Sequence, residues 1–367
     1  VSLWLNEAKN IPMNSNLASH NFLCQIISPF CDTRDIVRLK NKITRSEVSW
    51  ERVIHFANTH LIISALWVGL CEKGLDSELE NEVRYYLQEL HTLNLKRNQG
   101  LKRQAVEAIE ALNKNNIVPL LIKGAVQLFQ PIHKDFGVRI MVDLDILVPR
   151  NRIAEAIKAL TLIGYRRQEY SNSELAPLHH MAPMFRSGEY GSIELHHTAL
   201  GNRIANHILP TAEILAIAEE YNTAEVCFKV PNSTHSVLLA ILHSQLTHRF
   251  HQRLSLDYKA LHDMVTMISR QDRNIDWHQI QNRFAKHGMN SILRTHLWMA
   301  HRLLNLPVRN GIEPNAFTRS YHGLYLAMIC WKLLDSWYNR ALTFYKVRIM
   351  KHFGLLKLWS FKADSAI

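Results

Sequence analysis

The stretch LLIKGAVQLFQPIHKDFGVRIMVDLDILVP, residues 120–149, places two acidic residues inside a run that otherwise reads as a buried strand. Burying Asp143 and Asp145 two residues apart is costly unless positive charge lies between them. Side chains alternate between the two faces of a strand. A strand over residues 139–148 would therefore carry Arg139 and both aspartates on one face and only apolar side chains on the other.

A third acid lies on a later segment with the same alternation. In GSIELHH, residues 191–197, Ser192, Glu194 and His196 share one face, with apolar side chains on the other. If this strand neighbours the first, Glu194 completes a cluster of three carboxylates. Such hard oxygen ligands suit Mg²⁺ or Mn²⁺ better than zinc. The cluster suits two-metal chemistry, in which one ion activates a hydroxyl and the other holds a triphosphate.

The Lys123-Gly124 pair is expected at a turn from a strand, residues 117–123, into a helix, residues 124–130. Glycine lets a backbone approach a ligand closely, and a helix N-terminus offers free N–H groups to phosphate. Lys123 and Arg139 are candidate point charges for the same phosphates. The turn is therefore a candidate phosphate site beside the carboxylates.

Each of these signals is weak alone. A D-x-D pair often decorates an exposed strand end or binds structural calcium, a glycine commonly begins or ends a helix, and Glu194 could face solvent. The combination of two acids on an apolar strand, a preceding glycine turn and a third acid favours catalysis.

The rest of the chain predicts an α+β fold in three regions: a helical region 1–116, an α/β core 117–232 and a helical region 233–367. In the first region, one helix is expected from Ser49 as N-cap to Gly74 as stop, and a long or once-broken helix over 77–116. In the core, a helix capped by Asn151 is expected to end at Gly164. Strands are expected at 165–170 and 224–232, and a hairpin at 178–200.

Composition sets broad limits on the class of protein. Hydrophobic residues make up 47% of the 367 residues and charged residues 20%, as in soluble globular proteins. The net charge of +11 and pI near 9.4 fit either a polyanionic partner such as RNA or an ordinary basic surface. The five scattered cysteines, the absence of a signal-peptide pattern and the short apolar runs predict a cytoplasmic protein.

Two further features invite alternatives. Among 21 histidines no zinc-binding spacing occurs, and His180 and His196 are expected to line the active-site cleft. The basic, aromatic-rich residues 338–362 could contact an anionic membrane or RNA, but packing against the protein itself is the favoured interpretation.

The segments LIKGAVQL (121–128), VRIMVDLDILV (138–148) and SIELHHTAL (192–200) resemble an uncharacterised bacterial nucleotidyltransferase family. That family lies within the DNA polymerase beta-like superfamily, and the resemblance covers roughly residues 45–270. It implies a nucleotidyltransferase fold that binds an NTP and Mg²⁺ or Mn²⁺ and transfers a nucleotidyl group to a hydroxyl.

Position by position, the resemblance implies roles for individual residues. Asp143 and Asp145 become metal ligands, and Glu194 a third ligand or general base. The implied nucleotide contacts are Lys123, Gly124, Ala125, Arg139 and His196. One departure is Ala125, because the wider superfamily usually has serine or glycine at this position of the phosphate turn.

Two functions remain as hypotheses. In the first, an Mg²⁺-dependent enzyme moves a nucleoside monophosphate from an NTP to an acceptor hydroxyl on a protein, a tRNA or a small molecule, releasing pyrophosphate. In the second, a catalytically degenerate module of the same fold binds nucleotide or a partner without turnover. The three intact acids favour the first, because unneutralised carboxylates destabilise a fold that no longer binds metal.

Overall fold

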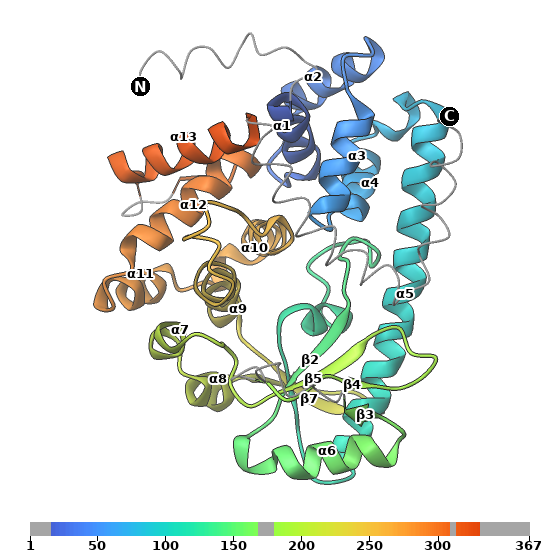
Figure 1. Ribbon diagram of the computed structural model, residues 1–367, viewed down its shortest axis with the longest axis vertical. Coiled ribbons are helices and arrows are strands. Elements are labelled where there is room, and N and C mark those ends of the chain that lie inside the picture. Colours follow the sequence, from blue (N-terminus) through green and yellow to red (C-terminus); the bar gives the residue numbers. More distant parts are fainter. Residues whose placement is uncertain (1–15, 168–179, 309–312, 331–367) are drawn as a thin grey trace, which may run out of the picture.

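The computed structural model describes residues 16–167, 180–308 and 313–330. A single mixed sheet lies between groups of helices (Figure 1). In this view helix α6 (Ile153–Leu162) lies below the sheet, and α9 (Ser233–Leu242) and α10 (Tyr258–Gln271) lie above it. The predicted α+β class is confirmed.

The N-terminal part of the described chain is helical. The helix expected over 49–74 is two helices, because Leu61 adopts a left-handed backbone with φ of 56° and interrupts it. Ser49 precedes the first of them without a side-chain capping hydrogen bond. The long helix expected next is unbroken over 33 residues. The elements are α1 (Asn16–Ile27), α2 (Thr33–Thr44), α3 (Trp50–Thr59), α4 (Ile63–Glu72), η2 (Asp76–Glu78) and α5 (Asn81–Asn113).

Helices α1 and α4 approach so closely that Gly69 has no room for a side chain. A Cβ at Gly69 would lie 2.4 Å from the carbonyl oxygen of Ile26. We expect Gly69→Ala to lower the free energy of unfolding by about 3 kcal/mol, because two backbones must separate. Urea unfolding measures this. The matched control is Gly323→Ala, where a Cβ meets nothing within 4 Å; equal midpoints for the two variants would contradict the close approach.

The strands form one sheet in the order β3-β4-β5-β2-β1-β7-β6. Strand β2 pairs with β5 in parallel, β1 pairs with β7 in parallel, and the other neighbours are antiparallel. The hairpin expected within 178–200 is present as β4 and β5. The strands are β1 (Leu120–Leu121), β2 (Asp143–Leu147), β3 (Arg166–Arg167), β4 (Met184–Phe185), β5 (Ser192–His196), β6 (Glu219–Asn222) and β7 (Cys227–Val230).

Several local predictions for the core differ from the structure. The strand expected over 139–148 begins only at Asp143. The helix expected at Gly124 is a short 3₁₀ helix, η3 (Lys123–Leu128). Asn151 lies inside a 3₁₀ turn, η4 (Arg150–Arg152), and does not cap α6. Strand β6 was not predicted, because its residues alternate too weakly in polarity.

The C-terminal part of the described chain is helical, as expected. Residues 331–367, which include the basic, aromatic-rich residues 338–362, lie outside the described residues. Among the described residues, none of the helices combines the length and the apolar character needed to cross a bilayer. The remaining elements are α7 (Arg203–Ile208), α8 (Thr211–Ile217), η5 (His243–Thr247), η6 (Asp272–Asn274), α11 (Trp277–Lys286), α12 (Asn290–Leu304) and α13 (Ala316–Cys330).

Two apolar cores cover the two faces of the sheet. The first unites the N- and C-terminal helices and includes Leu147 from β2. The second packs α6 and the C-terminal half of α5 against Leu144 and Ile146 of β2. The alternation predicted for this strand is therefore present, with Asp143 and Asp145 on the face opposite Leu144 and Ile146.

Candidate active site

Strands β2 and β5 bring the predicted acids together. In their parallel register Asp145 lies beside Glu194, and Asp143 lies beside Ser192. Directly paired residues of parallel strands project from the same face of the sheet. The three carboxylates therefore share one face, as expected if the two strands were neighbours.

Asp145 is the most buried of the three acids, at 3% exposure. Its Oδ1 accepts hydrogen bonds from Lys123 Nζ at 2.6 Å and from His196 Nε2 at 2.8 Å. Burial alone would raise the pKa of Asp145, but the Lys123 charge and the His196 hydrogen bond outweigh it and hold the pKa far below its usual value. Burial would likewise lower the pKa of Lys123, yet Asp145 raises it overall. Asp145 and Lys123 therefore form an ion pair at neutral pH.

The negative charge of Asp143 is compensated much less by neighbouring groups. Burial raises its pKa to about 6, and the negative charges of Asp145 and Glu194 add to the rise, although Lys123 opposes it. A carboxylate in this position would be ionised more easily by any cation bound nearby. Among the three acids, Asp143 is thus the one whose ionised form its surroundings disfavour.

Glu194 lies beside two histidines. Its Oε2 is 3.6 Å from His196 Nε2 and 3.7 Å from His180 Nε2. Burial would raise the pKa of Glu194, but its interactions with neighbouring groups, above all with His196, lower the pKa overall. The pKa of His196 is raised, because Asp145 and Glu194 outweigh the effect of its burial. Glu194 is therefore ionised at neutral pH, with His180 and His196 at its side.

The carboxylate oxygens of this cluster are ligands that suit a hard divalent cation. Ligand atoms of Asp145, Glu194 and His196 all lie within 4.8 Å of one another. The adjacent Asp143 adds a third carboxylate, and carboxylate-rich sets suit Mg²⁺ or Mn²⁺.

Comparison with known protein families agrees with this geometry. A family model described as an uncharacterised nucleotidyltransferase matches residues 46–305. The chain belongs to this nucleotidyltransferase family. The family resemblance of residues 45–270 is thereby confirmed and extended through α12. No curated protein and no solved structure matches the chain significantly.

The turn at Lys123–Gly124, the candidate phosphate site, differs in detail from the expectation. Lys123 has a left-handed backbone with φ of 53°. A Cβ at Gly124 would lie 3.0 Å from Arg139 Nε and 3.2 Å from Met141 Cγ. The bare Cα of Gly124 therefore makes room for side chains of the protein itself.

Ala125 is not part of the carboxylate group. Its methyl belongs to the apolar core, and its N–H donates to the Ile122 carbonyl oxygen at 3.2 Å. A serine hydroxyl here would be buried away from the acids. The departure from the superfamily's serine thus has a packing explanation.

Helix α10 contributes a cation that the sequence did not reveal. Lys259 Nζ donates to the Ile140 carbonyl oxygen at 3.4 Å. Burial lowers the pKa of Lys259, with Arg139 adding to the effect, while Asp143 and Asp145 oppose it. Lys259 therefore lies within electrostatic reach of the acids. On its own, a lysine in an amphipathic helix carries no signal of such a position.

The π-helical turn η5 also faces the site. Burial lowers the pKa of His243 well below its usual value, and the charge of Lys123 lowers it further. π-Helical turns often occur at functional sites. His243 is thus a neutral group close to the Lys123–Asp145 pair.

A second group of possible metal ligands comprises His133, His262 and Asp263, whose ligand atoms also lie within 4.8 Å of one another. Here, however, Asp263 is ion-paired with Arg139. Asp263 is the single carboxylate of the group, and both of its oxygens have partners, Arg139 at Oδ2 and His133 at Oδ1. The group is better explained as support for Arg139.

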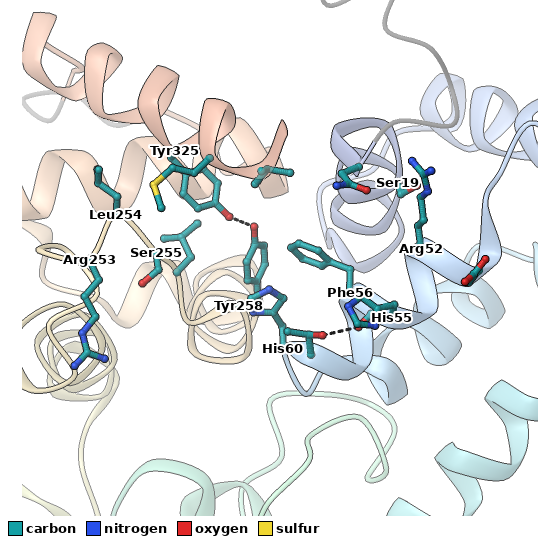
Figure 2. Close-up of a pocket in the computed structure, with 16 residues that line it drawn as sticks. Ser19, Arg52, His55, Phe56, His60, Arg253, Leu254, Ser255, Tyr258 and Tyr325 are labelled. Carbon is teal, nitrogen blue, oxygen red and sulfur yellow. Dashed lines mark hydrogen bonds between the residues drawn. The ribbon is translucent and has the colours of Figure 1, made fainter. Parts of the chain in front are cut away.

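A cavity of about 610 Å³ lies among α1, α3, α10 and α13 (Figure 2). Its lining includes the aromatic rings of Phe56, Tyr258 and Tyr325. The Tyr258 hydroxyl is hydrogen-bonded to that of Tyr325 and lies 2.5 Å from His20 Nε2. Among the lining residues that the structure describes, Glu51 is the sole carboxylate. The cavity therefore lacks the acid cluster that metal-dependent phosphoryl chemistry requires.

Proposed function

We propose that this nucleotidyltransferase moves a nucleoside monophosphate from an NTP to an acceptor hydroxyl and releases pyrophosphate, with Mg²⁺ or Mn²⁺ as cofactor. The observation that carries the proposal is the parallel register that sets Asp145 beside Glu194, with Asp143 on the same face. Three carboxylates on one face form the donor set that two-metal nucleotidyl transfer needs.

In this mechanism Asp143 and Asp145 would hold the metal, and Glu194 would be a third ligand or the general base. When bound there, the ions supply charge neutralisation of the triphosphate and a lowered pKa of the attacking hydroxyl. As general base, Glu194, which is ionised at neutral pH, would accept the proton of the attacking hydroxyl. Lys123 holds Asp145 in place at 2.6 Å and lends positive charge near the phosphates.

The proposed reaction requires only that the acceptor carries a hydroxyl group. A protein side chain, a tRNA 3′ end and a small molecule all satisfy this chemistry. The net charge of +11 favours an anionic acceptor such as RNA.

The test is label transfer from α-³²P-labelled NTPs, with Mg²⁺ or Mn²⁺, to the protein, RNA and small-molecule fractions of a cell extract. We expect the wild type to label one fraction and Asp143→Asn/Asp145→Asn to lose on the order of 10³-fold in rate. Glu155→Gln, at an exposed position of α6, is the control and should label normally. Equal labelling by the wild type and the double variant would refute the assigned site.

A second candidate function is nucleotide or partner binding without turnover. The observation in its favour is that Lys123 and His196 already satisfy Asp145 Oδ1 without metal. A thermal-shift series with each NTP, with and without Mg²⁺, separates the two functions. Metal-independent stabilisation by a nucleotide, together with no label transfer, would support the binding module.

A further inference from the structure

The backbone of Arg139 is fixed by two buried asparagines. Asn94 and Asn98 lie one turn apart on α5, and their Nδ2 groups donate to the Arg139 carbonyl oxygen at 3.1 Å and 2.9 Å. The same amides also donate to the carbonyl oxygens of Gly137 at 2.6 Å and Phe136 at 2.8 Å. Asparagine is unfavourable inside a helix. Two such residues on one carbonyl therefore indicate that the position of Arg139 matters.

The side chain of Arg139 is fixed by a residue of the C-terminal helices. Asp263 of α10 forms an ion pair with its guanidinium. The other oxygen of Asp263, Oδ1, lies 3.0 Å from His133 Nε2. The His133 ring stacks on His262, with centroids 4.8 Å apart. Burial lowers the pKa of His133 to about 3, so the ring is neutral and its Nε2–H donates to the carboxylate.

The Arg139 side chain also borders the phosphate turn. Its Nε is buried without a hydrogen-bond partner among the described residues. The Cβ of an alanine at Gly124 would lie 3.0 Å from this atom. Burial lowers the pKa of Arg139, and Asp143 and Asp145 are among the charges that oppose this. The guanidinium thus lies between its anchor and the acid cluster.

We propose that Asp263 and His133 are positioning residues that hold Arg139 against the turn, so that it contacts the triphosphate of the NTP. The inference rests on the proposed function, and it explains how the site would recognise the triphosphate. Asp263 neutralises part of the guanidinium and fixes its orientation. His133 in turn fixes Asp263. Asp263 comes from α10, so one of the C-terminal helices contributes to the site of the α/β core.

Binding measurements with MgATP, the other three magnesium NTPs and magnesium tripolyphosphate test the proposal. We expect Asp263→Asn to weaken binding of NTP and of tripolyphosphate by the same factor, about tenfold to a hundredfold. KM for the NTP should rise while kcat changes less, because a binding contact is lost. Weaker NTP binding with unchanged tripolyphosphate binding would overturn a role at the phosphates.

A double-mutant cycle separates positioning from a merely structural role. If Asp263 acts through Arg139, then Arg139→Gln/Asp263→Asn binds tripolyphosphate no more weakly than Arg139→Gln alone. Additive losses would overturn the proposal.

His133 provides a second pair of variants in case Asp263→Asn folds poorly. His133→Gln retains an N–H donor and should bind tripolyphosphate like the wild type, whereas His133→Leu should bind about tenfold more weakly. Equal binding by these two variants would overturn the role of His133. A wild type that binds neither NTP nor tripolyphosphate would refute the proposed function itself, while normal binding by every anchor variant would refute only the anchor.

Discussion

Asp145→Asn is expected to lower the free energy of unfolding by about 3 kcal/mol and to slow nucleotidyl transfer severely. The substitution removes the negative charge that Lys123 and His196 both contact and leaves a largely buried ammonium uncompensated. It also removes a proposed metal ligand, which costs on the order of 10³-fold in rate. Urea unfolding at pH 7 and the label-transfer assay measure the two effects on the same preparation.

Asp143→Asn is the matched variant, with the opposite effect on stability. Because the pKa of Asp143 is raised to about 6, its ionised form destabilises the fold at pH 7. We therefore expect the asparagine variant to be more stable than the wild type, by on the order of 1 kcal/mol, while transfer is lost to a similar extent. If both variants lost stability equally, the assigned charge distribution would be wrong.

Acid is expected to unfold the protein through its buried histidines. Burial lowers the pKa of His20, His296 and His322 to about 4, whereas the unfolded chain has values near 6.5. Between pH 6.5 and pH 4 the unfolded state therefore binds more protons, and stability falls as the pH falls. Each histidine contributes about 3 kcal/mol over this window. Since native proteins are stable by about 5–15 kcal/mol, we expect unfolding near pH 5.

Unfolding free energies measured between pH 7 and pH 4.5 check this expectation. His296→Gln, which cannot take up the proton, should reduce the slope of stability against pH, because one of several buried histidines no longer contributes. His278→Gln changes an exposed histidine and should leave the slope unchanged. The same slope for both variants would contradict the role of the buried ring.

The acid face of β2 was predictable because strand geometry is local. The alternation from Asp143 to Leu147 requires no knowledge of the rest of the chain. The same reasoning placed Glu194 and His196 together on β5. It failed at residues 139–142, which lie outside the sheet: two asparagines of α5 bind the Arg139 carbonyl, and Lys259 of α10 binds that of Ile140.

The sequence by itself thus determined which side chains could share a face, and the family pattern determined the class of protein. Only the tertiary structure decided that β2 and β5 are neighbours, and that Lys123 pairs with Asp145. It alone brought Asp263 to Arg139, across more than a hundred residues of chain. The physical reason is that periodicity is a property of adjacent residues, whereas pairing and burial depend on contacts between distant segments, which no local pattern specifies.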